Sequence, residues 1–232
     1  MSTPALDEKA VVKAYFNETG FERWRRIYGE GEVNKVQADI RAGHQETVNR
    51  VLAWLKAEPL QGRRICDAGC GVGSLSIPLA EAGALVYASD LSEKMVAEAQ
   101  VRARQVLGQG ENPIFAANDL EHLEGRYDTV VCLDVLIHYP DAQAIAMLKH
   151  LSTLAERSLI ISFAPWTPYY SLLKWIGNLF PGPSKATRAY LHRPFDMTST
   201  LEDLGWVVQA KTQVSTRFYF SYLVHVVRPA GA

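Results

Sequence analysis

The stretch Arg63-Arg-Ile-Cys-Asp-Ala-Gly-Cys-Gly-Val-Gly-Ser74 decides the fold of this chain. Its first six residues, Arg63–Ala68, predict a short strand, and residues 75–82, which follow the stretch, predict a helix. The glycines between them let the backbone turn tightly and approach a ligand closely, with the N-terminus of the helix behind the loop. A glycine loop in this setting predicts a nucleotide-type binding site in an α/β domain.

Strands and helices continue to alternate along the chain. Ser92 is a candidate N-cap for a helix over residues 93–107, and a second helix is expected over residues 141–155. Further strands are expected at residues 84–89, 113–117, 128–133 and 158–164. A helix over residues 196–204 and two antiparallel strands over residues 206–213 and 218–227 complete the pattern. We therefore predict an α/β, Rossmann-like fold with a doubly wound, mostly parallel seven-stranded sheet whose last strand is antiparallel.

The chain is expected to form a single domain with four parts. Residues 1–58 carry helical patterns over residues 6–16, 21–28 and 32–57, and they predict an N-terminal helical arm. Residues 63–164 form the binding core. Residues 165–194 are rich in aromatic residues and interrupt the alternation of strands and helices, so we interpret them as a lid inserted over the active edge of the sheet. Residues 195–232 supply the C-terminal part of the sheet.

The composition excludes several classes of protein. Among 232 residues, 24 are Lys or Arg and 25 are Asp or Glu, so there is no basic excess to drive sequence-independent nucleic-acid binding. The odd number of cysteines and the lack of a secretory signal indicate a cytoplasmic location. Cys66 and Cys70 have no second cysteine pair or histidine cluster nearby, so no metal site is predicted. No apolar run is long enough to span a bilayer.

Acidic and polar residues follow the first three predicted strands or stand at their ends. Asp67 stands two positions before Gly69, Asp90 closes the second strand, and Asn118-Asp119 follows the third. An acidic residue about 20 positions after the glycine loop is suited to bind ribose hydroxyls. Ser74 stands where a dinucleotide-binding loop has its last glycine, which disfavours an NAD enzyme.

These features together resemble the class I S-adenosylmethionine-dependent methyltransferases. The resemblance implies that Asp67, Gly69, Gly71 and Gly73 surround the methionine part of the cofactor. It also implies that Asp90 and Leu91 bind the ribose, and that Asn118 and Asp119 lie near the adenine. The alternative is a structural glycine turn beside two ordinary surface acids.

Four stretches carry a narrower resemblance, namely residues 15–48 (YFNETGFERWRRIYGEGEVNKVQADIRAGHQETV), the loop ICDAGCGVGSLSIPLA, residues 130–140 (VVCLDVLIHYP) and residues 163–194. They resemble the magnesium-protoporphyrin IX O-methyltransferase family over essentially the whole chain. The resemblance implies methyl transfer from S-adenosyl-L-methionine to the 13-propionate of magnesium protoporphyrin IX, in chlorophyll or bacteriochlorophyll synthesis, with S-adenosyl-L-homocysteine as product. The magnesium then belongs to the substrate. A methyltransferase for a quinone-type or other aromatic precursor, and an inactive porphyrin-delivering module, are the alternatives.

A propionate has a pKa of about 4.3 and is ionised at neutral pH, so the reaction needs alignment and a dry site more than a base. By the resemblance His138 and Tyr28 are the candidate catalytic residues that align the carboxylate. His138 could instead be held by backbone in a turn, and Tyr28 could instead pack the arm against the core. The remaining histidines, His44 and His192 among them, are weaker candidates.

Aromatic residues of the 165–194 segment could stack on a flat macrocycle, and Lys174, Lys185, Arg188 and Arg193 could hold the second propionate. The alternative is an ordinary lid core with a solvated rim. The resemblance further implies that the large porphyrin-binding subunit of magnesium chelatase is a partner. Peripheral contact with photosynthetic membranes is also expected, through exposed apolar surface of the arm or the insertion.

Overall fold

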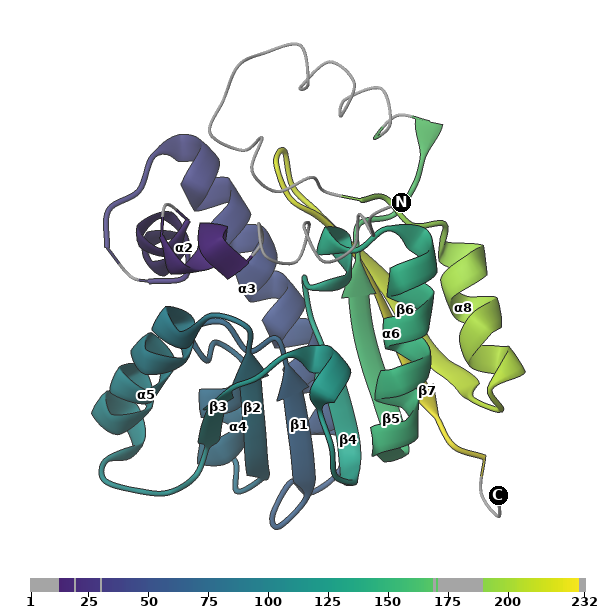
Figure 1. Ribbon diagram of the computed structural model, residues 1–232, viewed down its shortest axis with the longest axis horizontal. Coiled ribbons are helices and arrows are strands. Elements are labelled where there is room, and N and C mark those ends of the chain that lie inside the picture. The colour runs from purple at the N-terminus through teal and green to yellow at the C-terminus, as the bar shows by residue number, and fades with distance from the viewer. Residues whose placement is uncertain (1–12, 19, 30, 169, 171–189, 230–232) are drawn as a thin grey trace, which may run out of the picture.

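The computed structural model describes residues 13–229 except residues 19, 30, 169 and 171–189. Seven strands form one sheet in the order β3-β2-β1-β4-β5-β7-β6, as Figure 1 shows. The strands are β1 (Arg64–Ala68), β2 (Leu85–Asp90), β3 (Ile114–Ala117), β4 (Tyr127–Cys132), β5 (Ala155–Phe163), β6 (Val207–Ser215) and β7 (Phe220–Val227). Strands β1 to β5 are parallel, while β7 runs antiparallel to both β5 and β6. The predicted fold class is confirmed.

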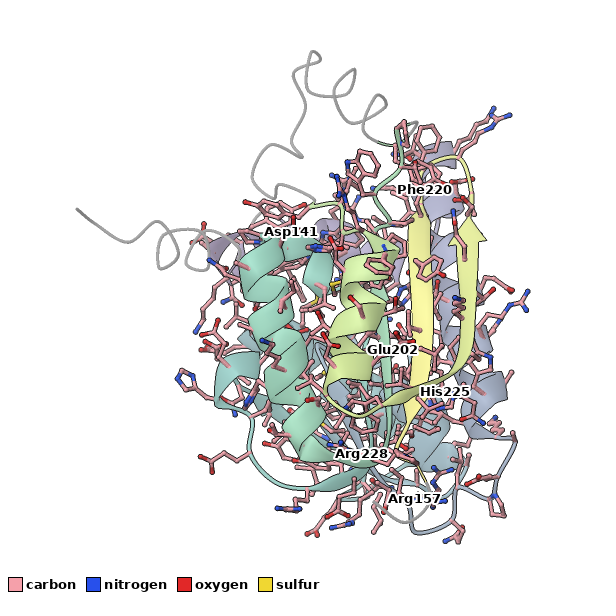
Figure 2. All side chains as sticks on the ribbon, turned by 90° about the vertical axis from the view of Figure 1, so that its right-hand side faces the viewer. Asp141, Arg157, Glu202, Phe220, His225 and Arg228 are labelled. Atoms are coloured by element: carbon pink, nitrogen blue, oxygen red, sulfur yellow. The ribbon has the colours of Figure 1, made fainter. Side chains whose placement is uncertain are left out.

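Helices cover both faces of this sheet. The helices are α2 (Phe21–Ile27), α3 (Lys35–Leu55), α4 (Ser76–Glu81), α5 (Glu93–Leu107), α6 (Asp141–Leu154) and α8 (Pro194–Asp203), with short 3-10 turns η1 (Leu120–His122) and η2 (Leu136–His138). Neighbouring strand residues point to opposite faces, so Val130 packs toward α6 and α8 while Val131 packs toward α3 and α4. Figure 2 shows α6 and α8 side by side in front of the sheet. Both faces of the central strands are therefore buried.

Several element boundaries differ from the sequence prediction. The helix expected from residue 32 begins at Lys35, because Asn34 is its N-cap. The Asn34 side chain accepts from the N–H of Gln37 at 2.9 Å, and the Gln37 side chain accepts from the N–H of Asn34 at 3.3 Å. The strand expected from residue 158 begins at Ala155, since the chain passes from α6 into β5 without a loop. The expected helix over residues 6–16 is described only from residue 13, and most of the 165–194 segment lies outside the described residues.

The arm is fastened above one edge of the sheet. Figure 1 shows α2 and the first part of α3 above the carboxyl ends of the central strands. The Arg41 guanidinium on α3 donates to the carbonyl oxygens of Ile27 at 2.8 Å and Arg26 at 2.6 Å. From α5, Arg102 donates to the carbonyl oxygen of Tyr28 at 2.6 Å. These bonds fix the end of α2 over the edge where the predicted site residues lie. No helix among the described residues is long and apolar enough to cross a membrane.

Candidate active site

The glycine loop is held by the end of β2. The N–H groups of Gly69 and Cys70 both donate to the carbonyl oxygen of Ser89 at 2.8 Å. The Asp90 carboxylate accepts from the N–H groups of Gly71 and Ser92, each at 2.9 Å. Burial raises the pKa of Asp90 although these two N–H groups oppose the shift. The loop and Asp90 therefore form one rigid unit with carboxylate lone pairs left to accept from a ligand.

Gly69 is the position in the loop where a side chain is excluded. Its φ is +89°, and a Cβ atom there would lie 2.1 Å from Cγ2 of Val135. Val135 belongs to the segment after β4, so the loop and that segment pack against each other through Gly69. The glycine is needed both for its backbone conformation and for this contact.

Three of the predicted cofactor residues lie behind the site. Asp67 is buried and accepts from the Ser76 hydroxyl at 2.5 Å, and burial raises its pKa to about 6 against the effect of that bond. Gly73 packs toward Ile77. The Asn118 side chain accepts from the N–H of Asp119 at 2.9 Å. These residues shape the loop and the end of β3, and they do not contribute to the cavity wall.

A cavity of about 620 Å³ lies above the carboxyl ends of the strands. One part of its wall, here named the loop end, comes from the glycine loop and the carboxyl ends of β2 and β3, and it contains Gly69, Gly71, Asp90, Leu91 and Asp119. The other part, here named the arm end, comes from the arm, the segments after β4 and β5 and the β6–β7 hairpin, and it contains Tyr28, His44, Asp134, His138, Tyr170, Arg217, Tyr219 and Phe220. Figure 2 shows Phe220 at the same end of the molecule as Asp141, the first residue of α6. The cavity therefore joins the loop region to residues from the arm and from the turn between β6 and β7.

His138 lies in η2, in the segment after β4. Its Nδ1 atom is buried without a hydrogen-bond partner in the described part of the chain, and its ring meets Phe16 edge-on at 5.5 Å. Burial lowers the pKa of His138 to about 4, so the ring is neutral at pH 7. A neutral imidazole with an unpaired nitrogen beside a cavity is suited to meet a polar atom of a ligand.

Tyr28 caps α2 and faces the same cavity. Its ring lies 5.3 Å from the ring of Trp24 and 4.3 Å from that of His44, measured between centroids. Burial raises the pKa of Tyr28 well above its ordinary value, and the charges of Asp134 and Asp90 add to the shift. Its hydroxyl therefore stays protonated and can donate a hydrogen bond.

A buried carboxylate at Asp134 is the feature that the sequence interpretation missed. It accepts from the Tyr219 hydroxyl at 2.8 Å, from His44 Nδ1 at 3.0 Å and from the Ser162 hydroxyl at 3.1 Å. Burial alone would raise the pKa of Asp134, but the hydrogen bond and charge of His44 and the two hydroxyls lower it. Its φ is +58°, an uncommon conformation for a residue other than glycine. No local pattern brings these partners together, because they come from α3, β5 and the β6–β7 turn.

The other candidate residues either lie outside the described residues or do not line the cavity. Lys174, Lys185 and Arg188 lie outside the described residues, and Arg193 stacks on Trp166 at 5.1 Å instead of lining the cavity. His192 is neither a surface residue nor part of the cavity wall. It is buried, with Nδ1 2.7 Å from Asp141 and Nε2 2.9 Å from the carbonyl oxygen of Leu136. The described residues contain no cluster of His, Cys, Asp or Glu that could hold a metal ion.

Comparison with known proteins agrees with this architecture. A model of the magnesium-protoporphyrin IX methyltransferase C-terminus matches residues 132–228, and a methyltransferase-domain model matches residues 65–157. A magnesium-protoporphyrin O-methyltransferase from Synechocystis sp. is 59% identical, over 98% of this chain and 100% of the relative. The chloroplastic magnesium protoporphyrin IX methyltransferase of Arabidopsis thaliana is 57% identical, over 95% of this chain and 71% of the relative.

Solved structures give the same result. The crystal structure of magnesium protoporphyrin IX methyltransferase from Synechocystis with bound SAH has a TM-score of 0.89 and 58% identity, covering 95% of this chain and 100% of that one. Sequence identity of this size over the whole length of the Synechocystis relative shows common membership of a family and not only a shared fold. The chain belongs to the magnesium-protoporphyrin O-methyltransferase family.

Proposed function

We propose that this chain transfers a methyl group from S-adenosyl-L-methionine to the 13-propionate of magnesium protoporphyrin IX, forming the monomethyl ester in chlorophyll or bacteriochlorophyll synthesis. The observation that carries the proposal is the continuity of the cavity. One wall carries Gly71 and Asp90 of the loop region, and the other carries Tyr28 and His138. A cofactor and a second substrate can therefore meet inside a single cavity. Membership of the family supports the choice of both molecules.

The loop region fits the cofactor. Gly69 and Gly71 line the cavity, Asp90 presents acceptor oxygens for ribose hydroxyls, and Asp119 follows β3 where the adenine is expected. The cofactor supplies a methyl group on a positively charged sulfur, and its transfer to a carboxylate oxygen yields an ester and a neutral thioether. Leu91 and Met95 add apolar surface to this end of the wall.

The residues of the other end align the carboxylate and exclude water. No base is needed, because the propionate is already ionised at neutral pH. This agrees with the states of the two candidate catalytic residues, since His138 is neutral and Tyr28 is protonated. We propose that both orient the carboxylate for in-line attack. Phe16 and Trp24 cover the approach with aromatic surface.

A methylation assay tests the proposal. The purified chain is incubated with methyl-labelled cofactor and either magnesium protoporphyrin IX or a quinone-type phenol, and the product is identified by mass spectrometry and NMR. A single methyl ester on the 13-propionate is expected. Methylation of the phenol with no porphyrin ester would replace the proposal by the quinone-type alternative. The match of residues 132–228 to the magnesium-protoporphyrin family favours the porphyrin, because this half supplies most of the far end of the cavity.

We further propose that the chain receives its substrate directly from the large porphyrin-binding subunit of magnesium chelatase, at the surface of a photosynthetic membrane on the cytoplasmic side. Support comes from large apolar side chains exposed at the carboxyl end of the sheet, on Phe195 (77% exposed), Phe218 (53%) and Trp166 (40%). Co-purification of the two proteins, with a Phe195→Asp, Phe218→Asp variant as control, tests this. Equal recovery of the partner with both forms would exclude this surface.

A further inference from the structure

His44 is a residue to which the sequence gives no special role. We infer that its imidazolium holds the carboxylate that accepts the methyl group, and that Asp134 and Tyr219 are positioning residues for this ring. The inference deepens the proposed function and rests on it. Three observations on the described residues support it. They concern the Nδ1 atom of His44 that Asp134 fixes, the charge of the groups around the ring, and the location of these groups in the cavity.

The ring of His44 has one nitrogen fixed and one nitrogen available. Nδ1 lies 3.0 Å from the Asp134 carboxylate, and the face of the ring packs on Tyr28 at a centroid distance of 4.3 Å. Within the described part of the chain no residue is hydrogen-bonded to Nε2, and the side chain lines the cavity. A ligand atom in the cavity is therefore the partner that Nε2 can reach.

A propionate bound at Nε2 would place the ring between two carboxylates, and this arrangement favours the doubly protonated imidazole. The hydrogen-bonded side chains of Asp134 and His44 are only 15% and 13% exposed. The other donors to the Asp134 carboxylate that the structure describes are the neutral hydroxyls of Ser162, Tyr219 and Ser221, so among these partners His44 is the one that can carry a compensating positive charge. An imidazolium donates from both nitrogens, which leaves one N–H for an incoming anion.

The location of the cluster places this donor beside the reacting end of the cavity. Val135, the neighbour of Asp134 in the chain, packs against Gly69 of the cofactor loop. A carboxylate on Nε2 would lie in the cavity that the cofactor loop and Tyr28 both line, where the methyl group must be transferred. The propionate that reacts is therefore the one that His44 holds.

The network around Asp134 keeps the donor in place. The Ser162 hydroxyl donates to Asp134 at 3.1 Å and accepts from its N–H at 2.8 Å, which maintains the unusual backbone conformation. The Tyr219 hydroxyl bridges Asp134 at 2.8 Å and Thr47 on α3 at 2.8 Å. Thr47 lies three positions after His44, on the same face of α3. Tyr219 therefore links the helix that carries the His44 ring to the Asp134 carboxylate that orients this ring.

This role differs in kind from that proposed for His138. The carboxylate loses its charge as the ester forms, so a cation that binds it contributes to the ground state at least as much as to the transition state. Loss of His44 should therefore weaken substrate binding and leave the rate constant of the bound complex much less affected.

The test compares two ligands that differ only in their carboxylates. Magnesium protoporphyrin IX and its dimethyl ester are titrated, by porphyrin fluorescence, into the protein saturated with S-adenosyl-L-homocysteine. For His44→Ala we expect the affinity for the diacid to fall about 10- to 100-fold, the range for a lost charge-assisted hydrogen bond, with the affinity for the ester unchanged. His44→Gln keeps a neutral donor and should lose less, while Asp134→Asn and Tyr219→Phe should show smaller losses of the same kind.

Gln45→Ala provides the matched control, because Gln45 is the next residue on α3 and is exposed. It should bind both porphyrins as the wild type does. Equal losses for diacid and ester in His44→Ala, with a similar result in His44→Gln, would show that the ring only packs and would overturn the inference. Unchanged affinity for both would do the same. A wild type that neither binds nor methylates the diacid would instead remove the proposed function itself.

Discussion

The two ends of the cavity are built in different ways. At the loop end, neighbouring strands provide nearly all contacts, mostly through backbone groups such as the N–H of Gly71 on Asp90. At the arm end, side chains from three distant segments, α3, β5 and the β6–β7 hairpin, converge on one carboxylate, Asp134. The loop end therefore tolerates little change in backbone shape, whereas the arm end depends on the identity of its side chains.

Backbone shape should give the largest effect. Gly69→Ala combines a positive φ with a Cβ 2.1 Å from Val135, so we expect a loss of roughly 3–5 kcal/mol in unfolding free energy and of measurable cofactor binding. Gly62→Ala is the control, since Gly62 also has a positive φ (+73°) but open space around it. For the control, urea denaturation should show a loss of only about 1–2 kcal/mol in unfolding free energy. Equal losses for the two variants would show that the Val135 contact adds nothing.

The two buried carboxylates should respond to pH in opposite directions. The pKa of Asp67 is raised to about 6, so the folded state binds more protons and stability is lost as pH rises from about 4 to 6, by at most about 3 kcal/mol. The pKa of Asp134 is lowered, so its contribution is present above about pH 4 and is lost as pH falls through the folded-state value.

Urea denaturation between pH 3 and 8 checks both signs. Compared with wild type, Asp67→Asn should remove a decline in stability between pH 4 and 6, and Asp134→Asn should remove a decline below pH 4. A difference profile of the same sign for both variants would contradict the contrast between the two ends.

Alignment at the arm end should show in turnover and not in cofactor binding. His138→Ala is expected to lower kcat about 100-fold, as misplacement of a reacting group does, with calorimetric affinity for S-adenosyl-L-homocysteine unchanged. His138→Gln should retain more activity because it keeps a donor. Between pH 5 and 9 no kinetic change should arise from His138, because its pKa is about 4. Full activity of His138→Ala would exclude the residue from the mechanism.

Substitution of Asp90 at the loop end should instead change cofactor binding directly. Asp90→Ala is expected to weaken cofactor binding by about 2 kcal/mol, through loss of charge-assisted hydrogen bonds to the ribose. Asp90→Asn retains one acceptor oxygen, so its affinity for the cofactor should lie between those of the wild type and Asp90→Ala. Calorimetry on the folded variants gives the affinities. An unchanged affinity in Asp90→Ala would remove the residue from the cofactor site.

The smallest effect is expected at Tyr28. Tyr28→Phe keeps the ring contacts with Trp24 and His44 and removes a neutral donor, so turnover should fall about 2- to 10-fold. Tyr28→Ala should fall further because the ring contacts are lost as well. Steady-state rates of both variants with magnesium protoporphyrin show whether the Tyr28 hydroxyl contributes to turnover. A Phe variant as active as wild type would leave the ring with a packing role only.

The sequence by itself determined the architecture and the loop end of the site. Strand and helix periods, the glycines from residue 69 onward and the acid at the end of β2 are local patterns, because hydrogen bonds between adjacent parallel strands bring consecutive βα units together. For that reason Gly69, Gly71, Asp90, Leu91 and Asp119 all line the cavity, as their positions indicate. The element boundaries shifted by a few residues where capping decides them, as at Asn34.

Tertiary structure alone decided which polar residues face the cavity at the arm end. Asp67 and Asp134 both follow apolar strand residues, yet Asp67 turns to the Ser76 hydroxyl and Asp134 turns toward α3 and β7. His44 and His192 are equally inconspicuous in the sequence, and only one of them lines the cavity while the other is buried against Asp141. The physical reason is that a buried charge is stable only with its partners, and the partners of Asp134 lie 28 to 90 residues away along the chain.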